Sequence, residues 1–283
     1  MRVLVTGVKG QLGYDVAKRL KELDMFDFKG VDLEDFDLTN HEQTIEYIRN
    51  YAPDAIVHCA AYTAVDRAET EQDICYAVNV NGTQYIAEAC KEIDAKMVYI
   101  STDYVFDGDG DDELEVDSPK KPISVYGKTK SLGEDKVTEL LSKYFIIRTS
   151  WVFGINGNNF VKTMSRLGSE RSEISVVADQ FGSPTYTPDL ARLIVDMIQT
   201  EKYGTYHGTN EGFCSWYDFA KAIMEKNNLA CKVLPITTEQ YPTPAKRPHN
   251  SRLSKVSLDK AGFKRLPNWE DALERYVAGM MDK

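Results

Sequence analysis

Short apolar runs alternate with longer amphipathic segments through the first half of the chain. Strands are predicted at "RVLVTG", "FKGVDLEDFDL", "DAIVHCAA", "KMVYIST" and "YFIIRTS", where β-branched residues dominate or polar residues close the run. Helical spacing of apolar residues follows in "QLGYDVAKRLKEL", "NHEQTIEYIRNY", "DICYAVNVNGTQYIAEACKEI" and "ISVYGKTKSLGEDKVTELL". Asn40 is the expected N-cap of the second helix. This alternation predicts a parallel sheet that is covered by helices on both faces.

The alternation becomes less regular beyond residue 151. "EISVVAD" and "GTYHGTN" are expected strands, and "TPDLARLIVDMIQ" is an expected helix with Pro188 in its first turn. We therefore expect an α/β fold with a Rossmann-type doubly wound parallel sheet. Residues 1–150 are the predicted NAD(P)-binding domain, completed by about 174–200. Residues from about 151–173 and 201–283 are predicted to form a small C-terminal substrate-binding lobe.

Length and charge narrow the classes of function. The 283 residues are 42% hydrophobic and 28% charged, as in an ordinary globular protein. A formal net charge of −10 argues against nucleic-acid or anionic-membrane partners, so an anionic substrate needs a local basic pocket. No apolar run approaches the roughly 18 residues of a membrane span, and no signal-peptide pattern is present, so a cytoplasmic location is expected.

Three glycines follow the first predicted strand and open the first helix. Gly7, Gly10 and Gly13 in "GVKGQLG" permit a tight turn and let the backbone approach a pyrophosphate. The helix N-terminus adds free amide donors for the same anion. Glycine spacing alone is weak, but the strand-turn-helix context predicts a dinucleotide site.

Asp32 ends the second strand, about 20 residues after the glycines, where a carboxylate accepts hydrogen bonds from adenine ribose hydroxyls. A plain turn residue is the alternative interpretation. The carboxylate would repel a 2′-phosphate and so slightly favours NADH, whereas Lys9 would offset the repulsion and keeps NADPH as an alternative. Further cofactor contacts are expected at the ends of later strands, from Asp37, Leu38, Ala60, Ala61, Tyr62 and Thr63.

The pattern Tyr-x-x-x-Lys occurs three times, and only its context distinguishes the copies. Tyr126 and Lys130 open the helix that follows "STDY", whose Thr102, Asp103 and Tyr104 lie at the carboxyl edge of the sheet. The pairs Tyr14/Lys18 and Tyr217/Lys221 lack such a strand end and are expected to be surface or packing pairs. Gly127, beside the phenol, is expected to let a ligand approach closely.

A phenol with an adjacent ammonium suits the reduction of a ketone. Hydride transfer places negative charge on the carbonyl oxygen, and a nearby acid must supply a proton. Lys130 is expected to lower the pKa of Tyr126, the predicted proton donor, and to bind the nicotinamide ribose. Thr102 is expected to hold the substrate oxygen by a hydrogen bond.

Two later residues are candidates for the substrate. Trp151 follows "FIIRTS" directly and offers a flat apolar surface to a sugar or base, with a core tryptophan as the alternative. Arg247 is a fork-shaped cation in a proline-rich loop and a candidate for a substrate diphosphate. A plain exposed loop arginine is the alternative.

The motifs "GVKGQLG", "STDYVFDG", "VYGKTK" and "RTSWVFG" together resemble the extended short-chain dehydrogenase/reductases, and most closely the dTDP-4-dehydrorhamnose reductase subfamily. "AAYTAVDRAE", "NNFVKTM", "DQFGSPT" and the "RP" at Arg247 extend the resemblance along nearly the whole chain. It implies NAD(P)H-dependent reduction of dTDP-4-dehydro-L-rhamnose to dTDP-L-rhamnose, a step in nucleotide-sugar biosynthesis.

The resemblance also implies roles for single residues. Thr102, Tyr126 and Lys130 become the catalytic trio, and Thr102, Asp103 and Trp151 become sugar-nucleotide contacts. Its implied cofactor contacts are Gly10, Gln11, Leu12, Asp32, Asp37, Leu38, Ala61, Tyr62 and Thr63. Some relatives form a magnesium-linked homodimer through a glutamate at the place of Asp15. Aspartate is shorter, so a homodimer is possible and no metal site is predicted.

Rival functions stay open at this point. The resemblance implies that nucleotide-sugar dehydratases carry an Asp-Glu pair after the strand-end threonine, whereas Tyr104 follows Asp103 here. Another nucleotide-sugar reductase or an epimerase fits the motifs as well, and tightly retained cofactor would favour the epimerase. A non-catalytic regulatory subunit that binds cofactor is the third alternative. Retention of Thr102, Tyr126 and Lys130 together favours an enzyme.

Overall fold

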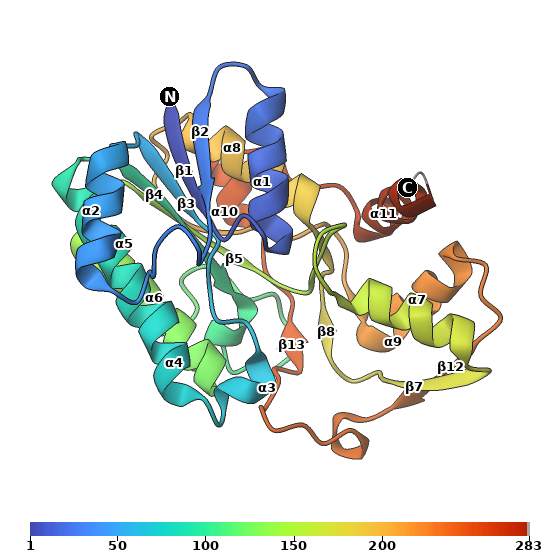
Figure 1. Cartoon of the computed structure of the whole chain (residues 1–283). Helices are drawn as coiled ribbons and strands as arrows, with labels where there is room; N and C mark the ends of the chain where they lie inside the picture. Colours follow the sequence, from blue (N-terminus) through green and yellow to red (C-terminus); the bar gives the residue numbers. More distant parts are fainter. Residues whose placement is uncertain (282–283) are drawn as a thin grey trace.

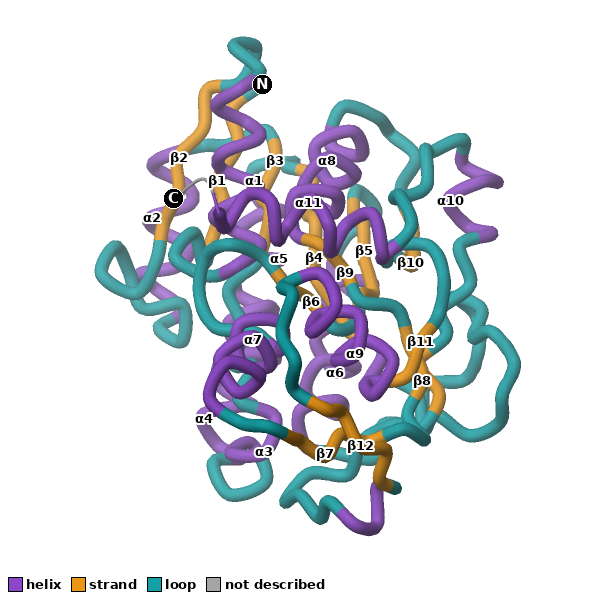
Figure 2. The backbone as a smooth tube through the Cα atoms, turned by 90° about the vertical axis from the view of Figure 1, so that its right-hand side faces the viewer, coloured by secondary structure: helices purple, strands orange, loops and turns teal. Residues whose placement is uncertain are grey.

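A parallel sheet of six strands organises the protein, whose computed structural model describes residues 1–281. The strands lie side by side in the order β10-β5-β4-β3-β1-β2 (Figure 2). Their bounds are β1 (Arg2–Thr6), β2 (Asp27–Val31), β3 (Ala55–His58), β4 (Lys96–Thr102), β5 (Tyr144–Thr149) and β10 (Gly204–His207). Because β2 and β3 flank β1 on opposite sides, the winding reverses there, and nucleotides bind such sheets at the carboxyl ends beside that switch point.

Helices cover both faces of the sheet, as the alternating pattern predicted (Figure 1). One face packs against α1 (Gln11–Glu22), α8 (Thr187–Ile198) and α10 (Val256–Ala261). The other face packs against α2 (His41–Tyr51), α5 (Thr83–Glu92) and α6 (Val125–Leu140). Each strand is therefore buried on two sides, which explains its continuous apolar run.

Local signals in the sequence set the starts of three helices. The Asn40 side chain caps α2 by accepting a hydrogen bond from the backbone of Gln43, as predicted. Pro188 lies in the first turn of α8, also as predicted. The Ser124 hydroxyl caps α6 and accepts from the backbone of Gly127, so the helix starts just before Tyr126.

A smaller lobe with its own apolar core lies beside the carboxyl ends of the strands (Figures 1 and 2). Its helices are α7 (Phe160–Glu170), α9 (Trp216–Lys226) and α11 (Trp269–Met281). Its strands are β6 (Val152–Phe153), β7 (Glu173–Val177), β8 (Phe181–Gly182), β9 (Thr185–Tyr186), β11 (Cys214–Ser215), β12 (Lys232–Ile236) and β13 (Asn250–Ser251). They form three small sheets: β7 with β12, β6 with β9, and β8 between β11 and β13.

Two segments lie on the other side of the predicted domain boundary. The strand β10 was expected in the lobe, yet it pairs with β5 and forms the edge of the main sheet. The strand β7 was expected to complete the Rossmann part, yet it pairs with β12 in the lobe. Pairing across long sequence separations decides both placements, and a single-strand pattern carries no information about its partner.

Four short elements pack against α6: α3 (Val65–Ala68), α4 (Gln72–Tyr76), the π-helix η1 (Ala77–Gly82) and the 3-10 turn η2 (Asp103–Val105). A second 3-10 turn, η3 (Thr238–Gln240), lies in the lobe, where Thr238 hydrogen-bonds to Asp179. None of the helices within residues 1–281 has the length and apolar character that crossing a bilayer demands.

Candidate active site

The glycine loop is packed so tightly that side chains are excluded from it. Gly7 has a φ of +69°, and a Cβ there would lie 2.7 Å from the backbone nitrogen of Ala60. A Cβ at Gly13 would lie 2.2 Å from the carbonyl oxygen of Gly7. No side chain caps α1, whose N-cap is Gly10, so the first amides of this helix face outward. This cradle fits the diphosphate of a dinucleotide.

A cleft of about 780 Å³ runs from this loop along the carboxyl edge of the sheet. Every predicted cofactor residue lines it, and so does every predicted catalytic residue. The predicted residues in its lining are Gly7, Gly10, Gln11, Leu12, Gly13, Asp32, Asp37, Leu38, Ala60, Ala61, Tyr62, Thr63, Thr102, Asp103, Tyr104, Tyr126, Lys130 and Trp151. Residues as far apart in sequence as Gly7 and Trp151 therefore share one space.

Asp32 marks one end of the cleft and is held by backbone amides. Its Oδ2 accepts from the amide of Lys9 at 3.0 Å, and its Oδ1 accepts from the amide of Leu33 at 2.9 Å. The Lys9 ammonium pairs with Glu34 and not with Asp32. Lys9 was expected to offset the repulsion between Asp32 and a 2′-phosphate, but its charge is already balanced by Glu34.

A side-chain amide fixes the loop after β3. Asn79, in the π-helix η1, accepts from the backbone of Tyr62 at 2.8 Å and donates to the Tyr62 carbonyl at 3.1 Å. The same amide donates to the Thr129 hydroxyl on α6 at 3.1 Å. Asn79 thus ties the cofactor side of the cleft to the helix that carries Tyr126 and Lys130.

A chain of hydroxyls and one carboxyl lies at the end of β4. Thr102 donates to Asp103 Oδ1 at 2.8 Å, and Ser251 from the lobe strand β13 donates to Asp103 Oδ2 at 2.5 Å. Burial raises the pKa of Asp103 to about 6, although both hydroxyls favour the ionised form. The Thr102 oxygen also accepts from the backbone amide of Tyr104 at 3.3 Å, and the hydroxyl forms a side-chain hydrogen bond with Tyr126.

Tyr126 stands edge-on to Tyr104, with 5.5 Å between ring centroids. Its enclosure in the cleft raises the pKa of the phenol, because a phenolate there loses hydration. The expected fall in the pKa of Tyr126 is wrong, because loss of hydration dominates over any effect of Lys130. The expectation for Gly127 is also wrong: a Cβ there would lie 2.2 Å from the Tyr104 carbonyl, so backbone contact explains this glycine and ligand contact does not.

Lys130 is 2% exposed and lies one turn after Tyr126 on α6. Burial lowers the pKa of its ammonium to about 7. The other two Tyr/Lys pairs lie outside the cleft lining: Tyr14 is exposed, and the Lys221 ammonium rests over the ring of Tyr217 at 5.4 Å. Their interpretation as surface or packing pairs is confirmed.

Trp151 combines two features of a functional residue. Its φ of +51° is rare for a bulky side chain, and its indole stacks on that of Trp216 with 3.6 Å between centroids. One part of the ring system packs on the lobe core, and the residue also lines the cleft. Trp151 is therefore partly a core residue and partly a residue of the cleft wall.

Arg247 lies outside the cleft lining and is already paired. Its guanidinium holds Asp66 in a fork, with distances of 3.0 Å and 2.8 Å, and donates to Thr243 at 2.6 Å. Asp66 comes from α3 of the Rossmann part, so this pair links the two parts of the protein at the rim. The Arg247 charge acts on the phenol of Tyr104, so Arg247 lies beside one predicted substrate residue although it does not line the cleft.

Sequence reasoning missed four residues that shape this site. They are Asp66, Asn79, Trp216 and Ser251. An amide among the apolar positions of "AVNVNG" was a usable signal for Asn79, whereas the other three carry none in their local sequence.

A metal site finds no support in the described residues. Among residues 1–281, no cluster of three His, Cys, Asp or Glu side chains could hold an ion. Asp15, at the position that raised the question of magnesium, is 6% exposed and accepts from the Thr187 hydroxyl at 2.5 Å.

Fold and cleft together define an extended short-chain dehydrogenase/reductase. The RmlD substrate binding domain family matches residues 1–281, and the chain belongs to this family. A dTDP-4-dehydrorhamnose reductase from Aggregatibacter actinomycetemcomitans is 42% identical over 290 residues, covering 98% of both chains.

Two solved structures are similar over almost their whole length. A dTDP-4-dehydrorhamnose reductase from Bacillus anthracis, in complex with NADP, is 47% identical with a TM-score of 0.96, covering 98% of this chain and 99% of that one. Its counterpart from Clostridium acetobutylicum is 41% identical with a TM-score of 0.97, covering 99% and 100%.

Proposed function

We propose that this protein reduces the 4-keto group of dTDP-4-dehydro-L-rhamnose with a reduced nicotinamide cofactor and gives dTDP-L-rhamnose. The observation that carries the proposal is the shared cleft, where Thr102, Tyr126 and Lys130 face the same space as the glycine loop. Relatives of matching name at 41 to 47% identity support the choice of substrate, since they align with nearly the whole chain.

The cofactor would lie along the cleft from Asp32 to Lys130. When bound, it supplies the hydride that goes to the carbonyl carbon. The turn amides and the N-terminus of α1 would hold its diphosphate, and Asp32 would accept from the adenine ribose. Asp37 and Leu38 would flank the adenine, and the loop from Ala60 to Thr63, held by Asn79, would support the other half of the dinucleotide.

Tyr126 donates the proton in this proposal. Its raised pKa keeps the phenol protonated until negative charge develops on the carbonyl oxygen. The O–H bond of Tyr126 then breaks as the new O–H bond forms, and the nearby Lys130 ammonium stabilises the phenolate that remains. Thr102 orients the phenol and donates to the substrate oxygen once its hydroxyl turns away from Asp103.

The sugar nucleotide would occupy the lobe side of the cleft. Trp151 offers its ring to the sugar, while Asp103 and Tyr104 lie at the strand end beside the reacting carbon. Arg247 is the proposed partner of the substrate diphosphate. Because the Arg247 guanidinium is paired with Asp66, it must leave that carboxylate in order to bind the substrate diphosphate.

We extend the proposal to the cofactor and favour NADH over NADPH. Asp32 lines the cleft near the adenine end, and Glu34, outside the lining, already balances the nearby Lys9. A 2′-phosphate placed there would meet a net negative field. The Bacillus anthracis relative was solved in complex with NADP, which favours NADPH instead. Comparing kcat/KM for NADH and NADPH decides between the two cofactors.

Turnover of the keto sugar tests the function. The purified chain is mixed with dTDP-4-dehydro-L-rhamnose and either cofactor, and the absorbance of the reduced nicotinamide is followed. We expect oxidation that depends on the sugar, and at least about a 100-fold loss in Tyr126→Phe with cofactor binding retained.

Tyr217→Phe is the matched control, because it removes a phenol from a Tyr/Lys pair outside the cleft. It should leave turnover unchanged. Absence of sugar-dependent oxidation in the parent chain would remove the proposed reaction, whereas full activity in Tyr126→Phe would remove only the proposed donor.

A further inference from the structure

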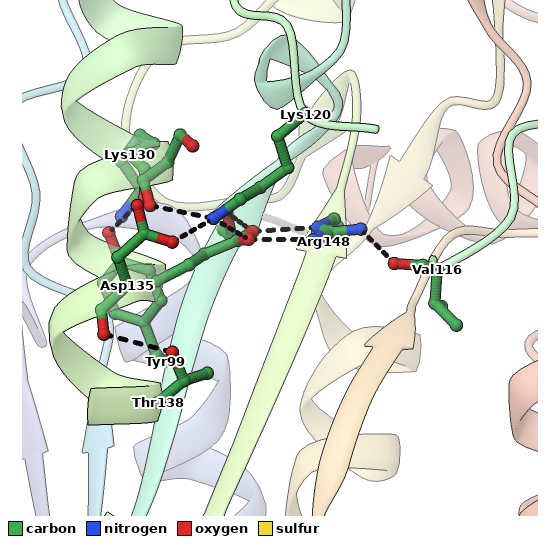
Figure 3. A network of polar contacts seen from close by, with 10 residues as sticks. Tyr99, Val116, Lys120, Lys130, Asp135, Thr138 and Arg148 are labelled. Atoms are coloured by element: carbon green, nitrogen blue, oxygen red, sulfur yellow. Dashed lines mark hydrogen bonds and ion pairs between the residues drawn. The ribbon is translucent and has the colours of Figure 1, made fainter. Parts of the chain in front are cut away.

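The ring of Tyr99 lies directly against the Lys130 ammonium. The Lys130 nitrogen is 4.0 Å from the ring centroid, and the Tyr99 hydroxyl donates to the backbone carbonyl of Lys130 at 3.3 Å (Figure 3). Tyr99 belongs to β4 and is fully buried. One strand residue therefore contacts both the charged end and the backbone of the lysine beside Tyr126.

Helix α6 leaves room for this ring. Gly133 lies three residues after Lys130, and a Cβ there would be 2.2 Å from the Tyr99 hydroxyl oxygen. A side chain at that position would push the ring away from the helix. The glycine in "SLGED" thus accounts for the close approach of β4 and α6 at this level.

No carboxylate within residues 1–281 lies at ion-pair distance from the Lys130 ammonium. The acidic group that acts most strongly on the ammonium is Glu134, one turn further on, and Arg148 donates to both its oxygens at 2.8 Å. The titratable groups that act on the ammonium are His58, Cys59, Cys75, Tyr99 and Glu134, and Tyr126 lies one turn before Lys130 on the same helix.

The uncharged members of that set add no opposing charge. Burial raises the pKa of Cys59 to about 12 and lowers that of His58 to about 3, so both are neutral near pH 7. Burial lowers the pKa of Lys130 itself to about 7, so about half of the lysine is protonated at neutral pH. Any contact that stabilises the ammonium therefore increases the charged fraction of Lys130 at neutral pH.

We propose that Tyr99 is a positioning residue, whose ring face holds the Lys130 ammonium in its charged form beside Tyr126. An ammonium over a ring face is attracted by the ring quadrupole, and the attraction is largest where water is excluded. The role of Tyr99 in catalysis rests on the proposed reduction, whereas its effect on Lys130 does not.

Three full-length variants separate the ring from its hydroxyl and from general packing. Tyr99→Phe keeps the ring face, and Tyr99→Leu removes it. Phe145→Leu, on the neighbouring strand β5, removes an equally buried ring that is absent from the contacts of Lys130. A fourth version carries a trifluorinated phenylalanine at position 99, which weakens the quadrupole while the ring keeps its shape.

The charge of Lys130 is followed by NMR titration of the lysine ε-carbon, which is assigned by its absence in Lys130→Met. We expect the midpoint to fall by about one pH unit in Tyr99→Leu and in the fluorinated version, and to stay in place in Tyr99→Phe and Phe145→Leu. The upper pH limit of kcat/KM should move with the midpoint.

An unchanged midpoint in the fluorinated version would overturn the proposal, even if Tyr99→Leu failed to fold. Equal shifts in Tyr99→Leu and Phe145→Leu would assign Tyr99 to packing alone. The titration needs no substrate, so it gives its answer even if the keto sugar proves not to be reduced.

Discussion

The indole of Trp151 stacks on the indole of Trp216, with 3.6 Å between ring centroids and 13° between planes. Trp151 leaves β5 with a φ of +51°, and Trp216 opens α9 of the lobe. Backbone strain at a bulky residue persists only where packing holds it. Trp216 of the lobe therefore fixes the position of Trp151 in the wall of the cleft.

Trp216→Leu should release Trp151 and weaken sugar binding. Aromatic pairs contribute about 0.5–1.5 kcal/mol beyond burial, so we expect KM for the nucleotide sugar to rise about three- to tenfold while KM for the cofactor is unchanged. Near-ultraviolet circular dichroism should lose the couplet of the two indoles. Trp269→Phe, the third tryptophan, is the control and should keep it. A retained KM in Trp216→Leu would contradict the link.

The choice of cofactor should depend on the charge of Asp32. Two unit charges about 4 Å apart interact by about 1 kcal/mol in water and more when partly buried. Asp32→Asn should therefore raise the ratio of kcat/KM for NADPH over NADH about tenfold or more. Asp27→Asn makes the same charge change at the other end of β2 and should leave the ratio alone. Equal ratios in all three proteins would show that Asp32 does not select the cofactor.

Much of this architecture is predictable from local patterns. The parallel sheet, the N-cap Asn40, Pro188 in α8 and the sharing of one cleft by Gly7 and Tyr126 all follow from periodicity and from the rule that sites gather at carboxyl strand ends. Those features depend on residues near in sequence, or on a general property of the fold.

The unpredicted features depend on distant partners. Arg247 meets Asp66 across 181 positions, and Ser251 meets Asp103 across 148, and neither pair has a local signature. The direction of the Tyr126 pKa was also out of reach, because it depends on how much water the folded cleft removes. Spacing on a helix indicates which groups are neighbours but not how strongly each is buried.

Gly13→Ala should disrupt the dinucleotide cradle. Its new methyl would lie 2.2 Å from the Gly7 carbonyl oxygen, so α1 or the loop must move. We expect at least a tenfold loss of cofactor affinity and about 1–3 kcal/mol of destabilisation, measured by fluorescence titration and denaturant unfolding.

Gly279→Ala on α11 is the matched control for that change, since its nearest atom would be 3.5 Å away. Alanine is the better helix former, so this variant should be neutral or more stable by up to about 1 kcal/mol. Normal cofactor affinity in Gly13→Ala would mean that the loop is more tolerant than its packing indicates.

Lys130→Met should make the protein more stable while it removes activity. Burial lowers the pKa of Lys130 from 10.5 to about 7, so the folded chain gives up at pH 7 to 10.5 a proton that the unfolded chain keeps. Stability of the parent therefore rises with pH across this window, and the full cost of the buried ammonium applies below pH 7. That cost is on the order of 5 kcal/mol, and methionine avoids it.

The gain from Lys130→Met is measured by denaturant unfolding between pH 6 and pH 10, as the difference from the parent. We expect the difference to be largest near pH 6 and to shrink as pH rises towards 10.5, because the parent lysine is neutral in both states only above that pH. Lys255→Met is the comparison, because burial lowers the pKa of Lys255 only to about 8 and its gain should be smaller. A difference that stays constant with pH would mean that packing, and not the proton, accounts for it. A fall in stability at pH 6 would show that the Tyr99 ring repays the whole cost of burying the charge.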